Sequence, residues 1–73
     1  MQDYKSQVNV TFPGPTYRVE YDTRQNANKM FVSEVVVKRN GEVIFWYNGQ
    51  PRLNKKEAEQ SAAAGLVHTT RNT

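Results

Sequence analysis

The segment RLNKKEAEQSAAAGLVH, residues 52–68, decides the fold, because it combines a helix start with a face of small side chains. Asn54 is suited to cap a helix, and Glu57 three residues later completes a pattern similar to a capping box. Small and apolar residues then recur at helical spacing: Ala58, Ala62 and Leu66, with Ala63 and Gly65 beside them. Because such small side chains let a helix axis come close to a β-sheet, we expect a helix that lies on one.

Two upstream segments predict the first strands of that sheet. Residues 16–22, TYRVEYD, alternate apolar and charged side chains, which is the pattern of a strand with one buried face. Residues 23–28, TRQNAN, are polar and predict a turn. Residues 29–39, KMFVSEVVVKR, resume the alternation and are rich in the β-branched residues that strands favour. The core-facing aromatic residues predicted here and in the next strand are Tyr17, Tyr21, Phe31 and Phe45.

A hairpin turn follows directly. Asn40-Gly41 is the favoured two-residue turn, because both positions tolerate positive φ. Residues 42–49, EVIFWYNG, return as a third strand, with Val43, Phe45 and Tyr47 expected on one face. The predicted fold is α+β, a three-stranded antiparallel sheet packed on one face by a C-terminal helix.

The beginning of the chain fits two structures. Residues 1–14 are rich in polar and β-branched residues, which favours an extended leader, and a short helix over residues 3–10 is the alternative. Pro13 and Pro15, on either side of Gly14, bias the chain away from helix there. We therefore expect a leader at 1–14, one domain at 15–68 and a flexible tail at 69–73.

Composition excludes several classes of function. The 73 residues include no cysteine and one histidine, His68, so we expect no disulfide, no metal site and no cofactor. The sequence has no arrangement typical of a catalytic site, so we do not expect an enzyme. No apolar run approaches the length that spans a bilayer, and the N-terminus lacks a signal-peptide pattern, so an intracellular protein is expected. The net charge of +3 favours polyanions as partners.

The order of these segments resembles the double-stranded RNA-binding domain family. NKKEAEQSAAAGLV is similar to the C-terminal helix of the family, PTYRVEY to its Pro-x-Tyr first strand, and FVSEVVV to its second strand. The resemblance covers residues 15–67. It implies an α-β-β-β-α fold with both helices on one face of the sheet, and double-stranded RNA as the partner. The protein is then expected to act in RNA processing or gene silencing, in the nucleus or the cytoplasm.

Three departures from the family pattern accompany the resemblance. The first helix is short or absent, and only Lys5, Ser6 and Gln7 could replace its RNA contact. The usual Gly-Pro-x-His stretch between the first two strands is replaced by TRQNANK, residues 23–29. Glu59 stands where many members have a third lysine.

The resemblance also implies an RNA-binding site. Lys55 and Lys56, in the first turn of the helix, would contact phosphates across the major groove, although they could also simply solubilise an exposed turn. The lysines oppose the helix dipole there unless an anion binds, which favours the phosphate role. The full set of predicted RNA-binding residues is Lys55, Lys56, Arg52, Asn54, Gln60, Arg24, Lys29 and Asn28.

An alternative function is a protein-interaction or dimerisation module with little RNA binding. Trp46 is expected on the sheet face opposite the helix, and an apolar cluster there would suit a protein partner or a second copy. Its predicted members are Val32, Val36, Ile44 and Trp46. Two further alternatives are a register shift that makes Trp46 part of the core, and stacking of single-stranded bases on the sheet.

Overall fold

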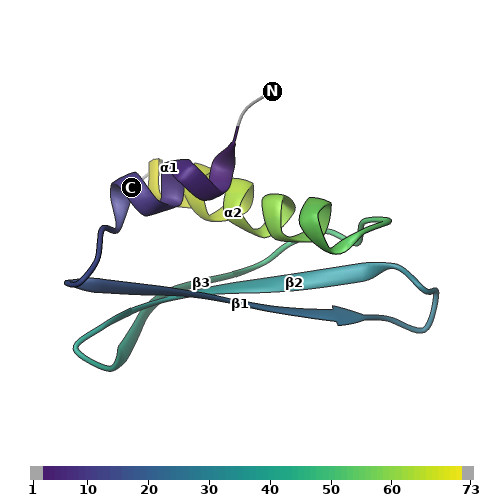
Figure 1. Cartoon of the computed structure of the whole chain (residues 1–73), viewed down its shortest axis with the longest axis horizontal. Coiled ribbons are helices and arrows are strands. Elements are labelled where there is room, and N and C mark those ends of the chain that lie inside the picture. The colour runs from purple at the N-terminus through teal and green to yellow at the C-terminus, as the bar shows by residue number, and fades with distance from the viewer. Residues whose placement is uncertain (1–2, 72–73) are drawn as a thin grey trace.

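A computed structural model describes residues 3–71 of the chain. The elements are α1 (Tyr4–Thr11), β1 (Tyr17–Gln25), β2 (Phe31–Arg39), β3 (Glu42–Asn48) and α2 (Lys55–Arg71). The strands form one antiparallel sheet in the order β1-β2-β3. Both helices lie side by side on one face of this sheet (Figure 1). The α-β-β-β-α fold predicted from the sequence is confirmed, and the first helix is short rather than absent.

The first strand is longer than its alternating pattern indicates. Pairing between β1 and β2 continues past Tyr21–Val35 to Gln25–Phe31, so residues 23–25 belong to the strand and the turn lies further on. Thr23 bonds to Ser33 across the strands, through their hydroxyl oxygens at 3.0 Å. The prediction that the strand ends before residue 23 is therefore wrong, because cross-strand and helix contacts stabilise a polar strand end.

The hairpin between β2 and β3 is as predicted. Asn40 and Gly41 have φ values of 53° and 80°, which the two-residue turn requires. Beyond the turn Lys38 pairs with Val43 whereas Val37 pairs with Phe45, so Ile44 is the extra residue of a β-bulge. Because paired residues share a face, Val43 lies on the Lys38 side of the sheet. The expectation that Val43 shares a face with Phe45 is wrong.

The segment before the sheet is helical, despite its β-branched residues. Asp3 caps α1: its carboxylate accepts a hydrogen bond from the Ser6 backbone N–H at 3.3 Å and one from the Ser6 hydroxyl at 2.8 Å. Val8 is completely buried and Phe12 nearly so, while Val10 is exposed. Burial of one face together with a cap outweighs the weak helix propensity of valine. For residues 4–11 the extended-leader prediction is wrong and the alternative, a short helix, is confirmed; residues 1–2 lie outside the described residues.

The second helix lies close against the sheet. Asn54 caps it as predicted, with its side-chain oxygen accepting from the Glu57 backbone N–H at 2.8 Å. Ala58, Ala62 and Ala63 are completely buried. A Cβ on Gly65 would overlap the ring of Tyr47 in β3, so only glycine permits this approach. Residues 69–71, expected in a tail, are helical, and residues 72–73 lie outside the described residues.

One core joins all these elements. The ring of Phe12, just after α1, lies 5.4 Å from that of Tyr17 and 5.5 Å from that of Phe45, measured between ring centroids. Tyr17 and Tyr21 are half-buried against the same core, whereas Phe31 is half-buried outside this cluster and Phe45 is 37% exposed. The buried members of this hydrophobic cluster are Val8, Phe12, Val35, Val37, Ala62, Ala63, Leu66 and Val67. This core fixes the orientation of α2, and with it the direction in which the lysines at its start point.

Candidate nucleic-acid interface

The start of α2 is held beside the turn between β1 and β2. The backbones of Arg52 and Phe31 exchange two hydrogen bonds: Phe31 N–H donates to the Arg52 carbonyl at 2.7 Å, and Arg52 N–H to the Phe31 carbonyl at 2.9 Å. The start of α2 and this turn therefore lie at the same end of the molecule (Figure 1). The bridge brings together two segments that are more than twenty residues apart in the sequence.

Lys55 and Lys56 are both exposed in the first turn of α2. The Lys55 ammonium lies 5.9 Å from the centre of the Phe31 ring, so its side chain lies over the beginning of β2. Lys56 lines a shallow groove along α2, together with Arg52 and Asn54. The Asn54 carbonyl oxygen is used by the helix cap, which leaves its amide N–H groups for a ligand.

The turn between β1 and β2 is closed by Asn26. Its side-chain oxygen accepts from the backbone N–H groups of Asn28 at 2.9 Å and Met30 at 3.1 Å. Lys29 has a φ of 62°, and it is exposed together with Asn28. The turn is therefore an ordered structure that presents Lys29 and Asn28 at the end where α2 begins.

Two of the predicted RNA-binding side chains are engaged elsewhere. Arg24 forms an ion pair with Asp22, two residues before it in β1, with 2.8 Å between nitrogen and oxygen. Thr23 points toward the helices, so Arg24 points to the opposite face of the sheet and away from the lysines of α2. Gln60 bonds to the start of α1: its side-chain oxygen accepts from Tyr4 N–H at 2.9 Å, and its amide donates to Asp3 at 2.9 Å.

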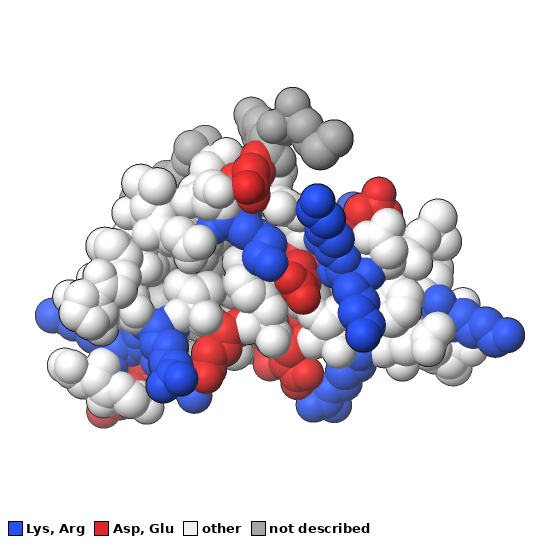
Figure 2. All heavy atoms as spheres, in the orientation of Figure 1, with Lys and Arg blue, Asp and Glu red and all other residues white. Residues whose placement is uncertain are grey.

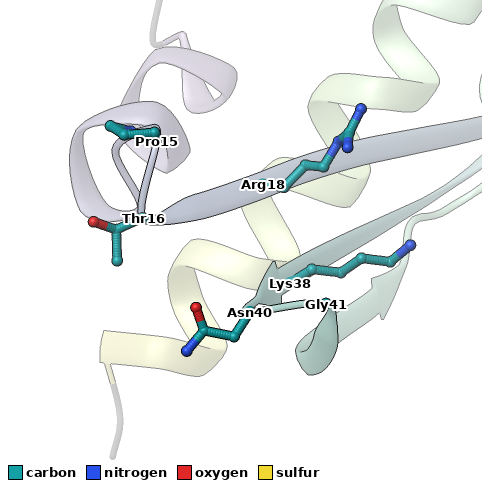
Figure 3. A pocket seen from close by; sticks show the side chains of 6 residues that line it. All are labelled: Pro15, Thr16, Arg18, Lys38, Asn40 and Gly41. Atoms are coloured by element: carbon teal, nitrogen blue, oxygen red, sulfur yellow. The ribbon is translucent and has the colours of Figure 1, made fainter.

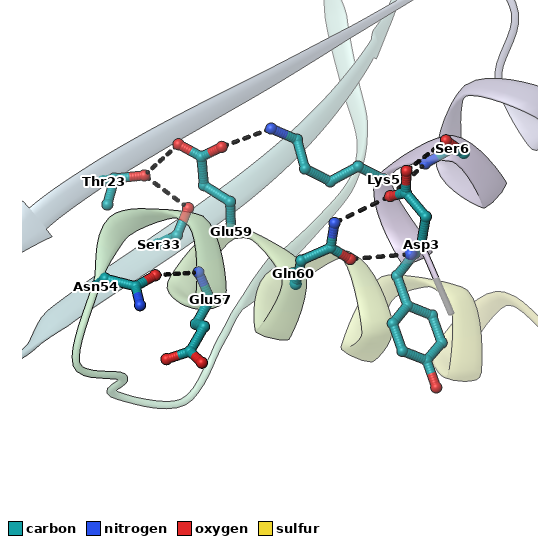
Figure 4. A network of polar contacts seen from close by, with 10 residues as sticks. Asp3, Lys5, Ser6, Thr23, Ser33, Asn54, Glu57, Glu59 and Gln60 are labelled. Atoms are coloured by element: carbon teal, nitrogen blue, oxygen red, sulfur yellow. Dashed lines mark hydrogen bonds and ion pairs between the residues drawn. The ribbon is translucent and has the colours of Figure 1, made fainter. Parts of the chain in front are cut away.

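A polar network next to Gln60 ties α1 to α2 and the sheet (Figure 4). The Lys5 ammonium lies 2.6 Å from one carboxylate oxygen of Glu59, and the other oxygen accepts from the Thr23 hydroxyl at 3.1 Å. The hydrogen bond from Lys5 holds the pKa of Glu59 below its usual value. Hydrogen bonds from Gln60, and then from Ser6, lower the pKa of Asp3 from 3.8 to about 2. The sequence does not reveal this network, because its contacts between α1, β1 and α2 join residues that are far apart in the chain.

A second basic group lies at the opposite end of the sheet. Figure 3 shows Arg18 and Lys38 beside the hairpin turn, in a shallow pocket completed by Pro15, Thr16, Asn40 and Gly41. Both cations contact Glu20, Lys38 at 2.9 Å and Arg18 at 3.6 Å. The hydrogen bond from Lys38 lowers the pKa of Glu20. In Figure 2, Lys and Arg side chains appear toward both ends of the visible face and also at its middle, where most of the acidic side chains lie.

The sheet face turned away from the helices carries the predicted apolar cluster. Trp46 is 60% exposed and pairs with Val36, so the alternative in which it belongs to the core is wrong. Ile44 is exposed at the bulge, and Val32 and Val36 are half-buried. Asp22, Arg24 and Glu34 lie next to Val32. The face is thus apolar at Trp46 and charged around it.

Residues 3–71 contain neither a metal-binding cluster nor a helix that could span a membrane. No group of three or more His, Cys, Asp and Glu side chains in this range is placed to hold a metal ion. None of the helices described is both long enough and apolar enough to cross a membrane.

Comparison with known proteins gives one match. A family model described as the double-stranded RNA binding motif matches residues 2–68. The matched range includes α1, the whole sheet and most of α2. No curated protein and no solved structure matches the chain.

Proposed function

The chain belongs to the double-stranded RNA binding motif family, and from this premise we propose that it binds RNA duplexes through the start of α2. The family suggests double-stranded RNA as the partner, and a single module of this kind is not catalytic in itself. Members of the family recognise the shape of the A-form duplex, because its major groove is too deep and narrow for side chains to read.

The exposed pair Lys55 and Lys56 carries this proposal. Backbone N–H groups at a helix start lack partners within the helix, and the helix dipole favours anions there. Two cations at the helix start are repelled by the helix dipole on their own. A phosphate that binds between them and the N–H groups makes the electrostatic energy of this arrangement favourable. The bridge between Arg52 and Phe31 supports the proposal, because it holds the helix start in one orientation before RNA arrives.

The turn at 26–30 would make the second contact. Lys29 can neutralise a phosphate, and the Asn28 amide can bond to a ribose 2′-hydroxyl, which distinguishes RNA from DNA. Both side chains are exposed at the end of the molecule where α2 begins. Arg24 points the other way, so we assign it no direct contact in this proposal.

Such a module would act by bringing duplex RNA to other domains or partner proteins. We therefore place it in a protein of RNA processing or RNA silencing, in the nucleus or the cytoplasm. This assignment follows from the nature of the proposed partner.

The double variant Lys55→Ala/Lys56→Ala tests the binding role. Loss of two phosphate contacts should reduce the slope of log affinity against log salt by about 1.8, which is about 60-fold in affinity at about 0.1 M salt. The matched control is Arg18→Ala/Lys38→Ala, which removes the same charge at the other end of the sheet and should leave most of the affinity. Equal losses in both variants would show a nonspecific charge effect and contradict the proposed site.

The exposed face at Trp46 favours a second candidate function, protein binding or self-association. Trp46 is 60% exposed and Val43 53%, and β3 is an edge strand with one unpaired side. An apolar cluster on an edge strand can pair with another chain. Sedimentation of the wild-type chain and of Trp46→Ala over a range of concentrations tests this function. A wild-type chain that stays monomeric at high concentration would count against self-association.

A further inference from the structure

Glu59 occupies the position where the family resemblance implies a third lysine, and the structure shows what it does there. It lies one helical turn after Lys55, on the same side of α2, and its side chain is 25% exposed. Its two carboxylate oxygens bind partners on two different elements, Lys5 in α1 and Thr23 in β1. The carboxylate is therefore fixed between α1 and β1, one helical turn beyond Lys55.

This arrangement pairs the positive charge of α1 within the protein. Lys5 is the only Lys or Arg in the sequence of α1, and its ammonium lies 2.6 Å from Glu59 and 4.8 Å from the centre of the Tyr21 ring. The hydroxyl of Ser6 donates to Asp3, and that of Thr11 donates to the Gln7 carbonyl. The ammonium group of the first helix and the hydroxyl groups of its serine and its threonine are thus directed to the protein itself.

The Lys5 ammonium has three N–H donors, so a phosphate could share it with Glu59 only by coming close to the negative carboxylate. A phosphate that took Lys5 away would leave the carboxylate facing the RNA backbone as an unpaired negative charge, and Thr23 would hold it in that place. Both effects oppose RNA contact by α1.

We propose that Glu59 is a positioning residue of the RNA interface. It holds Lys5 away from phosphate, so that only the start of α2 and the β1–β2 turn contact the RNA. This inference rests on the proposed function and deepens it by naming the class of RNA. With one of the three groove contacts withdrawn, the domain would recognise a short duplex of about 11 base pairs, two thirds of the about 16 that the family spans.

Glu59→Gln tests the inference, because it keeps the shape and the acceptor for Thr23 but weakens the hold on Lys5. With an RNA duplex of about 20 base pairs, we expect tighter binding by up to about 8-fold at about 0.1 M salt and a salt slope steeper by about 0.9. Glu42→Gln, at the hairpin end, is the control with the same change in net charge and should alter both quantities much less. A Glu59→Gln variant that binds no more tightly than Glu42→Gln would overturn the inference.

The double variant Lys5→Gln/Glu59→Gln separates charge release from a merely structural role. Here the pair is gone but no cation is released, so the salt slope should return to the wild-type value. A slope about 0.9 shallower than wild type would show that Lys5 already contacts phosphate, and would overturn the inference. Thermal melting of each variant would show that the fold is kept.

The outcomes for the wild-type chain distinguish this inference from the proposed function. If the wild type binds the duplex and Glu59→Gln binds no better, the inference fails alone. If the wild type does not bind but Glu59→Gln does, the proposed function fails for the natural chain and the inference is supported. If neither binds, both fail.

Discussion

Replacing Gly65 with alanine should destabilise the domain, although alanine is the better helix former. In an exposed helix interior the change gains about 1 kcal/mol. Here the new Cβ would overlap the Tyr47 ring of β3, so the ring must turn out of the core or α2 must move away from the sheet. Overpacking of this kind costs about 1–3 kcal/mol, and the upper end applies because several ring atoms overlap.

The two terms leave a net loss of about 2 kcal/mol in the free energy of unfolding. For a domain of this size, such a loss lowers Tm by about 8–16 °C. Thermal unfolding followed by far-UV circular dichroism measures the shift. Urea unfolding of the same samples provides an independent value of the free energy.

The same substitution in a Tyr47→Val variant tests whether the overlap with the ring causes the loss. Tyr47→Val removes the ring atoms that the new Cβ would meet, while valine remains suited to a strand. In this background Gly65→Ala should become stabilising, by up to about 1 kcal/mol, because only the helix propensity remains. An equal loss in both backgrounds would show that the close approach of α2 to β3 is not the cause.

Three further predictions concern the side chains of Tyr21 and Asp3. Tyr21→Phe should raise stability by about 1 kcal/mol in urea unfolding, because the Tyr21 hydroxyl is buried with no hydrogen-bond partner among the described residues, and no gain would mean that it has one. Burial raises the pKa of Tyr21 to about 12, so the neutral form is favoured in the fold, and stability should fall as pH rises from about 10 to 12 in wild type but less in Tyr21→Phe. The Asp3 pKa is lowered from 3.8 to about 2, chiefly by Gln60, so its contribution is complete above pH 4 and lost as pH falls through 2. Asp3→Asn should flatten that acid dependence in thermal melts, and an unchanged profile would contradict the role of the cap.

Much of the fold could be predicted from local patterns. The Asn40-Gly41 turn and the Asn54 cap are short-range signals that act through the backbone of their own neighbours, and both were predicted correctly. Local patterns left residues 4–11 open between an extended leader and a short helix, because the helix depends on burial of Val8 and Phe12 in a core built from distant segments. The bulge at Ile44 likewise results from the pairing of two strands, and alternation within β3 alone does not reveal it.

Part of the candidate site could also be predicted from local sequence, and part could not. The exposure of Lys55 and Lys56 follows from their place at a helix start, which the sequence shows. The commitment of Gln60 to α1 and of Lys5 to Glu59 could not be predicted, because the two partners in each contact are more than fifty residues apart. These long-range contacts decide which polar side chains remain for a ligand.

The most direct test of the central claim is a titration of the wild-type chain with an RNA duplex of about 20 base pairs, beside a DNA duplex of the same sequence and the RNA single strand. We predict that the chain binds the RNA duplex at micromolar concentration or below and binds the other two much more weakly, with an affinity that falls steeply as salt is raised. Equal binding to all three nucleic acids, or binding to none, would contradict the claim that this domain recognises double-stranded RNA by its shape.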